Sequence, residues 1–151
     1  MNKNLSNIPI TDLIPQRPPF VMVDRLISCC LTDAVTELAI RPDNIFCDND
    51  NLSRPGMLEN MAQSCAARMG WLNMTRNEAV KIGMIGEIKN CKFVRQPKVG
   101  ELVTTHVHIV EDIFNLTLAT VTMKIGEEIL ASTTIKIATV DEVPEKINDK
   151  Q

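Results

Sequence analysis

The sequence predicts an α+β fold in which an antiparallel sheet of about six strands wraps around one long central helix. Residues 55–74 repeat apolar side chains at spacings of three and four, which is the period of an amphipathic helix. Segments on both sides of it are rich in β-forming residues and are bounded by turn residues. Strands and helices do not alternate along the chain, which disfavours a doubly wound parallel sheet.

Length and composition are those of one globular domain. The chain has 151 residues, of which 44% are hydrophobic and 23% are charged. We expect the domain to span residues 10–140. The terminal segments 1–9 and 141–151 are polar or charged with little to bury, so we expect them to be flexible.

Charge and hydropathy narrow the classes of partner. The formal net charge of -3 lacks the basic footprint of a nucleic-acid-binding domain. No run of apolar residues is long enough for a membrane span or a signal core. We therefore expect a cytoplasmic protein that binds neither nucleic acid nor membrane. The five cysteines form no disulfide framework or C-x-x-C pair, which predicts reduced cysteines.

Two strands are predicted before the helix. Residues 20–28, FVMVDRLIS, are rich in β-formers, and residues 32–41 alternate as a half-buried strand does. A short hairpin through residues 29–31 would join them. Before them, Thr11 is placed to cap a single helical turn. Residues 42–54 are mostly polar turn-formers, which predicts a loop leading into the helix.

The predicted helix has a broad apolar stripe and unusually small flanking side chains, which would let a sheet curl closely around it. Ser53 is a candidate N-cap. Four further strands are predicted in residues 81–94, 101–112, 113–124 and 128–139. The stripe consists of Met57, Leu58, Met61, Ala62, Cys65, Ala66, Met69 and Leu72.

Three motifs occur in the order and spacing of a known family. They are LIPQRPPFVMVDR (residues 13–25), ENMAQSCAARMG (59–70) and KFVRQPKVGELV (92–103). Together they resemble the 3-hydroxyacyl-(acyl carrier protein) dehydratases. This resemblance implies the hot-dog fold, lyase activity on acyl thioesters in a fatty-acid or polyene pathway, and no cofactor.

Two departures from the family pattern concern the site. The family places its catalytic histidine after the first proline of the opening motif, whereas Gln16 follows Pro15 here. The H-F-P-G stretch before the helix is replaced by FCDNDNLSR, and Pro55 and Gly56 lie two residues closer to the glutamate. We therefore expect a different pocket mouth.

Dehydration needs a base for the proton beside the thioester carbonyl, an acid for the leaving hydroxyl and donors for the enolate oxygen. The resemblance assigns the acid role to Glu59. Gln63 lies four residues later on the same helix face and is placed to orient it. Gln16 can position a thioester but cannot act as a base, because an amide does not exchange protons near neutral pH.

The resemblance also predicts which residues contact the substrate and the carrier protein. A cluster of basic residues in a net acidic chain fits docking of an acidic acyl carrier protein, or else a solvated strand edge that resists aggregation. The predicted substrate-binding residues are Gln63, Gly56, Met57, Phe20 and Phe93, and the predicted docking residues are Lys89, Lys92, Arg95 and Lys98.

Two other patterns are weaker. His106 and His108 share one face of a predicted strand, but no cysteine pattern or nearby carboxylate completes a metal site. We expect neither a metal site there nor a histidine in the pocket. Gly83 and Gly86 lack the helix that follows a dinucleotide fingerprint, and predict close backbone packing instead.

Three functions remain open at this level. The first is a dehydratase impaired by the missing histidine. The second is a hot-dog thioesterase in which the helix carboxylate activates water. The third is a non-catalytic acyl-binding subunit that pairs with a histidine-bearing paralogue. Subunits of the family pair edge to edge and share the pocket, so we expect a homodimer or higher oligomer, or a heterodimer with a related subunit, that binds acyl carrier protein or an acyl-pantetheine thioester.

Overall fold

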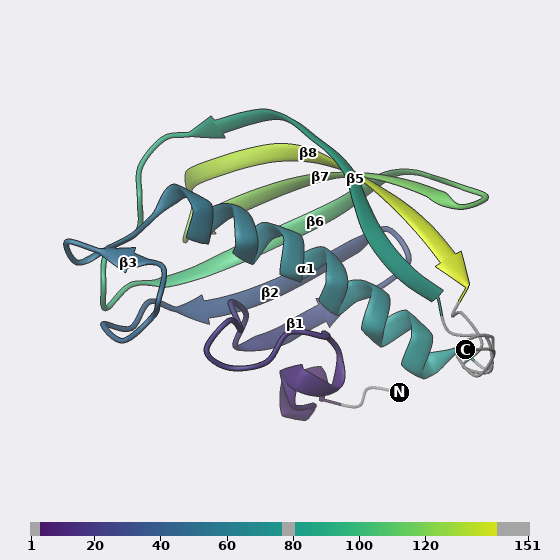
Figure 1. Cartoon of the computed structure of the whole chain (residues 1–151), viewed down its shortest axis with the longest axis horizontal. Coiled ribbons are helices and arrows are strands. Elements are labelled where there is room, and N and C mark those ends of the chain that lie inside the picture. Colours follow the sequence, from purple (N-terminus) through teal and green to yellow (C-terminus); the bar gives the residue numbers. More distant parts are fainter. Residues whose placement is uncertain (1–3, 77–80, 142–151) are drawn as a thin grey trace, which may run out of the picture.

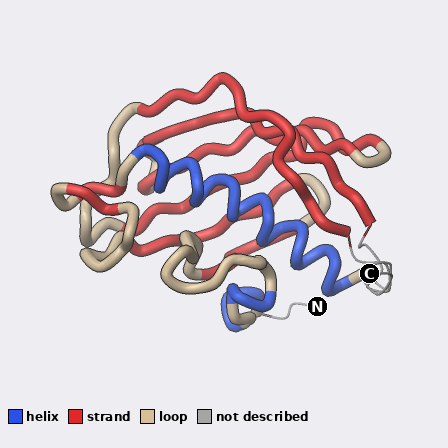
Figure 2. Tube along the Cα trace, in the orientation of Figure 1, coloured by secondary structure: helices blue, strands red, loops and turns tan. Residues whose placement is uncertain are grey.

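One long helix lies against a six-stranded antiparallel sheet (Figure 1). The structure is a computed structural model that describes residues 4–76 and 81–141. Helix α1 spans Arg54–Thr75, and the strands extend beyond it on both sides (Figure 2). This arrangement confirms the fold class predicted from the sequence.

The strands follow the sheet order β1-β2-β6-β7-β8-β5, and every neighbouring pair is antiparallel. Strands β1 and β5 therefore form the two edges of the sheet. Among the residues that the structure describes, no helix has the length and apolar character needed to cross a bilayer. The strands are β1 (Arg25–Cys29), β2 (Asp33–Ala39), β5 (Lys81–Phe93), β6 (Leu102–Ile113), β7 (Leu116–Ile125) and β8 (Glu128–Asp141).

The connecting segments contain short elements, of which the sequence predicted only one helical turn near Thr11. The loop before α1 holds a small hairpin of β3 (Cys47–Asp48) and β4 (Asn51–Leu52). Two single 3-10 turns, Leu5–Asn7 and Ile10–Asp12, precede β1, and the second begins after Pro9 rather than at Thr11. Leu5 and Ile8 pack against the core, so residues before Ile10 contribute to the domain. Residues 1–3 and 142–151 of the two expected flexible ends lie outside the described residues.

The first strand is shorter than predicted. Residues 20–24 are outside the sheet, and β1 begins at Arg25. The N–H of Met22 donates to the side chain of Gln63 at 2.7 Å, and the carbonyl of Met22 accepts from Asn60 at 2.8 Å. Because two helix side chains satisfy these backbone groups, the segment needs no strand neighbour at Met22.

The start of α1 follows the sequence prediction. The hydroxyl of Ser53 accepts from the N–H of Gly56 at 3.2 Å, which makes it the N-cap. A Cβ atom at Gly56 would overlap the side chains of Phe46 and Leu52. The glycine therefore allows the preceding loop to pack tightly against the first turn of the helix.

The buried face of α1 is partly polar, unlike the predicted apolar stripe. Asn60 and Ser64 are fully buried beside apolar residues such as Met61. The hydroxyl of Thr105 on β6 donates to Asn60 at 2.6 Å, and Thr36 on β2 bonds Ser64 at 2.7 Å. These bonds fix the helix against the sheet, because Asn60 and Ser64 each have a partner on a strand.

Candidate active site

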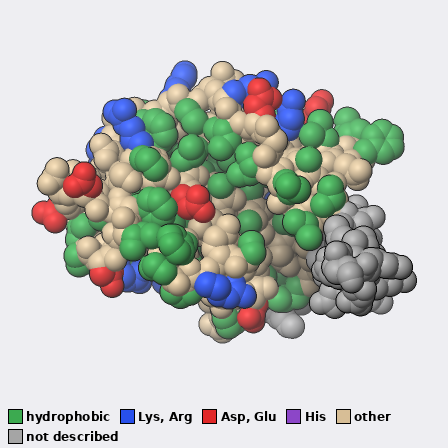
Figure 3. All heavy atoms as spheres, in the orientation of Figure 1, with side chains coloured by type: hydrophobic (Ala, Val, Ile, Leu, Met, Phe, Trp, Pro, Cys, Tyr) green, Lys and Arg blue, Asp and Glu red, His purple; other side chains and the backbone are tan. Residues whose placement is uncertain are grey.

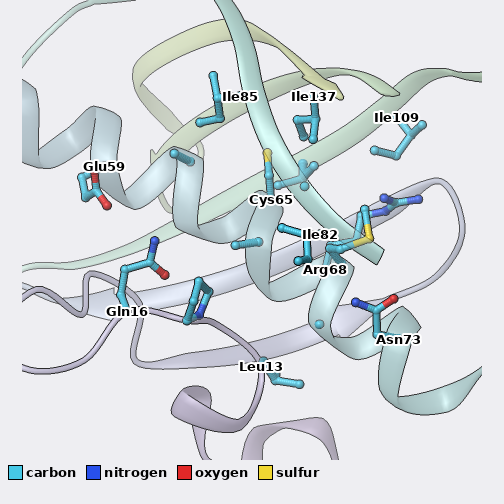
Figure 4. Close-up of a pocket in the computed structure, with 17 residues that line it drawn as sticks. Leu13, Gln16, Glu59, Cys65, Arg68, Asn73, Ile82, Ile85, Ile109 and Ile137 are labelled. Carbon is cyan, nitrogen blue, oxygen red and sulfur yellow. The ribbon is translucent and has the colours of Figure 1, made fainter. Parts of the chain in front are cut away.

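A cavity of about 540 Å³ lies between α1, the opening segment at residues 13–16 and the sheet. Its lining is mainly apolar. Figure 4 shows Glu59 and Gln16 at one end, with Arg68 and Asn73 towards the other. The sheet side is formed by Ile82, Ile85, Val107, Ile109 and Ile137.

Glu59 is held in place by Gln63. The amide nitrogen of Gln63 donates to the Glu59 carboxylate at 2.8 Å and to the carbonyl of Phe20 at 2.8 Å. The amide oxygen of Gln63 accepts from the N–H of Met22 at 2.7 Å. Because a backbone N–H can only donate, this third bond fixes which way the amide faces. Gln63 is 1% exposed, so the hydrogen bond predicted from the spacing of four residues is present in a buried setting.

Gln16 is placed by the packing of the opening segment on the helix. A Cβ atom at Gly70 would overlap the carbonyl of Leu13, so the glycine permits this close approach. The guanidinium of Arg17 donates to the carbonyls of Ile14 and Gln16 at 2.9 and 2.7 Å. The side-chain oxygen of Gln16 is buried and has no hydrogen-bond partner among the described residues. A hydrogen-bond acceptor therefore lies unpaired at the Glu59 end of the cavity.

Arg68 is a cavity residue that the sequence analysis did not predict. It is 3% exposed, and its guanidinium donates to the carbonyl of Leu31 at 2.8 Å. Asp112 lies 3.9 Å away, and the buried Nε of Arg68 has no partner among the described residues. Arg68 lies nine residues after Glu59 on α1. Nine residues of helix place the two half a turn apart, so they face different directions.

The two histidines of the chain lie away from the cavity. His106 and His108 are about half exposed on β6, and Val107 between them lines the cavity from the opposite face. Both rings bond one carboxylate oxygen of Asp33, at 2.7 and 3.0 Å. Asp33 lies near them because β2 pairs with β6 and places Asp33 opposite His108, a neighbour that the sequence pattern did not reveal. No group of three or more His, Cys, Asp or Glu side chains in the described residues is arranged to hold a metal ion.

The matching family model covers residues 8–148 and is that of the ApeP-like proteins, described as ApeP dehydratase. This chain belongs to the ApeP-like dehydratase family. The assignment confirms the resemblance seen in the three sequence motifs.

Two curated relatives of this ApeP-like chain are 3-hydroxyacyl-(acyl carrier protein) dehydratases named FabZ. The one from Oceanobacillus iheyensis is 30% identical over 107 residues, which is 67% of this chain and 74% of the relative. The one from Caldanaerobacter subterraneus is 26% identical over 146 residues, which is 91% of this chain and 100% of the relative.

Solved structures share the hot-dog fold with this ApeP-like chain. The dehydratase heterocomplex ApeI:P from Xenorhabdus doucetiae matches with a TM-score of 0.81 at 15% identity, covering 95% of this chain and 99% of that one. A hypothetical thioesterase with coenzyme A from Streptococcus pneumoniae matches with a TM-score of 0.64 at 9% identity, covering 79% and 87%. At these identities the likeness shows the fold alone.

Four residues predicted to bind substrate in this ApeP-like chain are outside the cavity lining. Gly56 packs against the loop before α1, and Met57 is fully buried in the core. Phe20 is 56% exposed. Phe93 lies under the guanidinium of Arg54, with 5.7 Å from the carbon of that group to the ring centre. None of the four lines the cavity in this structure.

The predicted docking residues divide into two groups. Lys89, Lys92 and Lys98 are exposed. Arg95 instead forms ion pairs with Glu101 at 3.0 Å and Glu128 at 2.8 Å. Those two carboxylates offset the charge of Arg95 within the chain.

Cys65 contributes a thiol to the cavity lining. Burial raises the pKa of this thiol to about 12, although the nearby Arg68 lowers it in part. Because the thiolate is the nucleophilic form, Cys65 behaves as a small apolar side chain at neutral pH. Glu59 and Gln16 are therefore the groups in the lining that can take part in acyl chemistry at that end.

Proposed function

We propose that this chain is a dehydratase-type subunit that binds 3-hydroxyacyl thioesters of acyl carrier protein, in a fatty-acid or polyene type of pathway. The observation that carries the proposal is the pairing of Glu59, oriented by Gln63, with Gln16 at one end of an apolar cavity. An apolar cavity suits an acyl chain. Membership of the ApeP-like dehydratase family and the similarity to FabZ support the reaction class.

Glu59 and Gln16 have different roles in the dehydration step. The C–H bond beside the thioester carbonyl breaks, its electron pair forms the new double bond, and the C–O bond to the 3-hydroxyl breaks. Glu59 delivers the proton with which the hydroxyl leaves as water. The unpaired oxygen of Gln16 accepts a hydrogen bond from that hydroxyl and orients it. Neither residue takes the proton from carbon in this assignment.

We infer that a related subunit supplies the missing base. The chain contains two histidines, and both are paired with Asp33 on the outer face of the sheet. Edge strand β5 exposes Ile82, Met84 and Ile85 by 44%, 58% and 45%. Two of these three residues also line the cavity, so a subunit paired with this edge would cover it. The heterocomplex in the name of the ApeI:P structure supports such a pairing.

Hydration and dehydration assays on acyl-pantetheine thioesters test the proposal, with the chain alone and with a histidine-bearing paralogue. We expect activity with the paralogue, and a loss of about a hundred- to ten-thousand-fold with Glu59→Gln. The melting temperature should stay nearly unchanged, because the amide keeps the shape of the acid. Full activity of Glu59→Gln would remove Glu59 from the mechanism. Hydrolysis without hydration would make the protein a thioesterase, and inactivity of every combination would favour a non-catalytic acyl-binding role.

Light scattering tests the inferred subunit pairing. We expect a dimer, either of this chain or with its paralogue, at micromolar concentration. A strictly monomeric chain that does not bind the paralogue would contradict the shared cavity.

Carrier-protein docking has a separate test. We propose that the three exposed lysines, Lys89, Lys92 and Lys98, attract the acidic carrier protein. Changing them together to glutamate should raise the KM for a carrier-bound substrate by about tenfold and leave a pantetheine-bound substrate unaffected. Lys124→Glu on β7 is the charge control. Equal effects on both substrates would exclude docking at these lysines.

A further inference from the structure

Two buried side-chain atoms lack hydrogen-bond partners in the described part of the chain, and both belong to residues that line the cavity. They are the side-chain oxygen of Gln16 and Nε of Arg68. Buried polar atoms nearly always have partners in proteins. The proposed reaction accounts for Gln16 through the substrate hydroxyl. The donor on Arg68, towards the other end of the cavity, remains to be explained (Figure 4).

The contacts of Arg68 within the chain do not fully offset its charge. Its Nη2 donates to a neutral carbonyl, that of Leu31. The only carboxylate paired with it in the described residues is Asp112, at 3.9 Å and with a side chain that is 52% exposed. A long ion pair to an exposed partner is weak, whereas burial of an arginine with an unpaired donor is costly. The contacts of Arg68 within the described residues therefore leave its charge only partly offset and one buried donor without a partner, in a residue that lines the cavity.

The position of Arg68 sets what can reach it. Along the helix axis it lies about 13 Å from Glu59, at 1.5 Å per residue. The cavity passes from Glu59 to Arg68 beside Ala62, Cys65 and Ala66, whose small side chains leave room. Because the two residues are also half a turn apart around the helix, the acyl chain needs at least roughly ten carbon–carbon bonds to reach from one to the other.

We propose that Arg68 binds an oxygen atom at the distal end of the acyl chain. The cavity then prefers acyl thioesters that end in a carboxylate or hydroxyl group over those that end in a methyl group. The apolar lining between the two polar ends holds the hydrocarbon part. This inference rests on the proposed function, since it takes the thioester to lie at the Glu59 end.

Equilibrium binding by calorimetry tests this preference. The probes are 3-hydroxyacyl-pantetheine thioesters of about fourteen carbons that end in methyl, hydroxyl or carboxylate, and a four-carbon thioester too short to reach Arg68. The protein is the full chain, together with its paralogue where the two copurify. The variants are Arg68→Met and Arg68→Lys. Asp112→Asn is the matched control, because it removes the ion pair without changing the cavity lining.

We expect the unaltered protein to bind the oxygen-ended thioesters about ten- to a hundredfold more tightly than the methyl-ended one, as for a charge-assisted hydrogen bond. Arg68→Met should abolish that preference without weakening binding of the four-carbon thioester. Asp112→Asn should keep the preference. Arg68→Lys should retain tight binding of the carboxylate end and lose that of the hydroxyl end, because the ammonium keeps the charge but not the planar donor geometry.

The outcomes separate this inference from the proposed function. Equal binding of all long thioesters, with normal binding of the four-carbon probe, overturns the role of Arg68 alone. Failure of every probe to bind, the short one included, overturns the proposed function. If Arg68→Met does not fold, Arg68→Lys decides: an unchanged order of affinities in that variant overturns the inference.

Discussion

The two faces of the sheet differ in whether the polar side chains beside them have hydrogen-bond partners. On the outer face, His106, His108 and Asp33 satisfy one another in an exposed cluster. On the inner face, the cavity contains Gln16 and Arg68, each with a buried atom that has no partner in the described chain. Figure 3 shows the face on which α1 lies outermost, where hydrophobic side chains are widespread. Residue type alone would direct attention to the histidines, whereas enclosure and unpaired polar atoms direct it to the cavity.

The largest effect on the inner face is expected from Gln63→Met. The change keeps the side-chain volume but leaves the N–H of Met22 and the carboxylate of Glu59 without their partner. We expect the free energy of unfolding to fall by about 2–4 kcal/mol, measured by urea denaturation. The control is Gln96→Met, which removes one bond, to the carbonyl of Leu52. It should cost about 1 kcal/mol, and equal losses would mean that Gln63 is not a special anchor.

Gln16→His tests whether the cavity lacks only a base. A histidine with a pKa near 6.5 suits proton abstraction at neutral pH, and the packing of Leu13 on Gly70 should keep the position of the new side chain. We expect the hydration rate of an enoyl thioester to rise at least about tenfold for the chain without its paralogue. If the variant still binds substrate but its hydration rate equals that of the unaltered protein, Gln16 does not occupy the position of a base.

The outer cluster should have a small effect on stability, present at neutral pH and lost in acid. The hydroxyl of Thr32, followed by His108 and His106, lowers the pKa of Asp33 to about 2. A depressed carboxyl pKa stabilises the fold above the unfolded pKa near 4, and this contribution is lost as the pH falls towards 2. We expect Asp33→Asn to lower stability at pH 7 by less than about 1 kcal/mol. The difference from the unaltered protein should vanish between pH 4 and 2 in melting curves, and a constant difference would exclude this linkage.

The smallest effect is expected from the paired change of His106→Gln and His108→Gln. Since both side chains point away from the cavity, kcat and KM should stay within about twofold of the unaltered protein. The measurement is the same hydration assay. A tenfold or larger loss of hydration activity would contradict the assignment of the reaction to the inner face. It would indicate that a histidine takes part in the mechanism.

Periodic patterns of apolar residues predicted most of the fold. The predicted helix at residues 55–74 and the four strands after it match α1 and β5 to β8 closely, because an apolar spacing of 3.6 or 2 reports one buried face directly. Residues 20–24 were wrongly included in a strand. Their β-forming composition is real, but the partners of Met22 are helix side chains, which no local pattern reveals.

Hydrogen bonds within the site were predictable from spacing only where one element holds both partners. Glu59 and Gln63 lie four residues apart on one helix, so their contact followed from spacing. Arg68 was missed because its surroundings come from Leu31 and Asp112, each on a different part of the chain. Asp33 was missed for the same reason, since 73 residues separate it from His106. A charged residue among small helix side chains was the only local signal for Arg68.

The bonds of Gln63 have a mechanical consequence. One amide group holds the carboxylate of Glu59 and the backbone of Phe20 and Met22 at the same time. A hydrogen bond to an ionised carboxylate is shorter and about twice as strong as one to a neutral acid. A change in the charge of Glu59 therefore changes the strength of its hydrogen bond to Gln63. The same amide also bonds the backbone of the segment that follows Gln16. The opening segment is thus connected to the charge of the glutamate through a single side-chain amide.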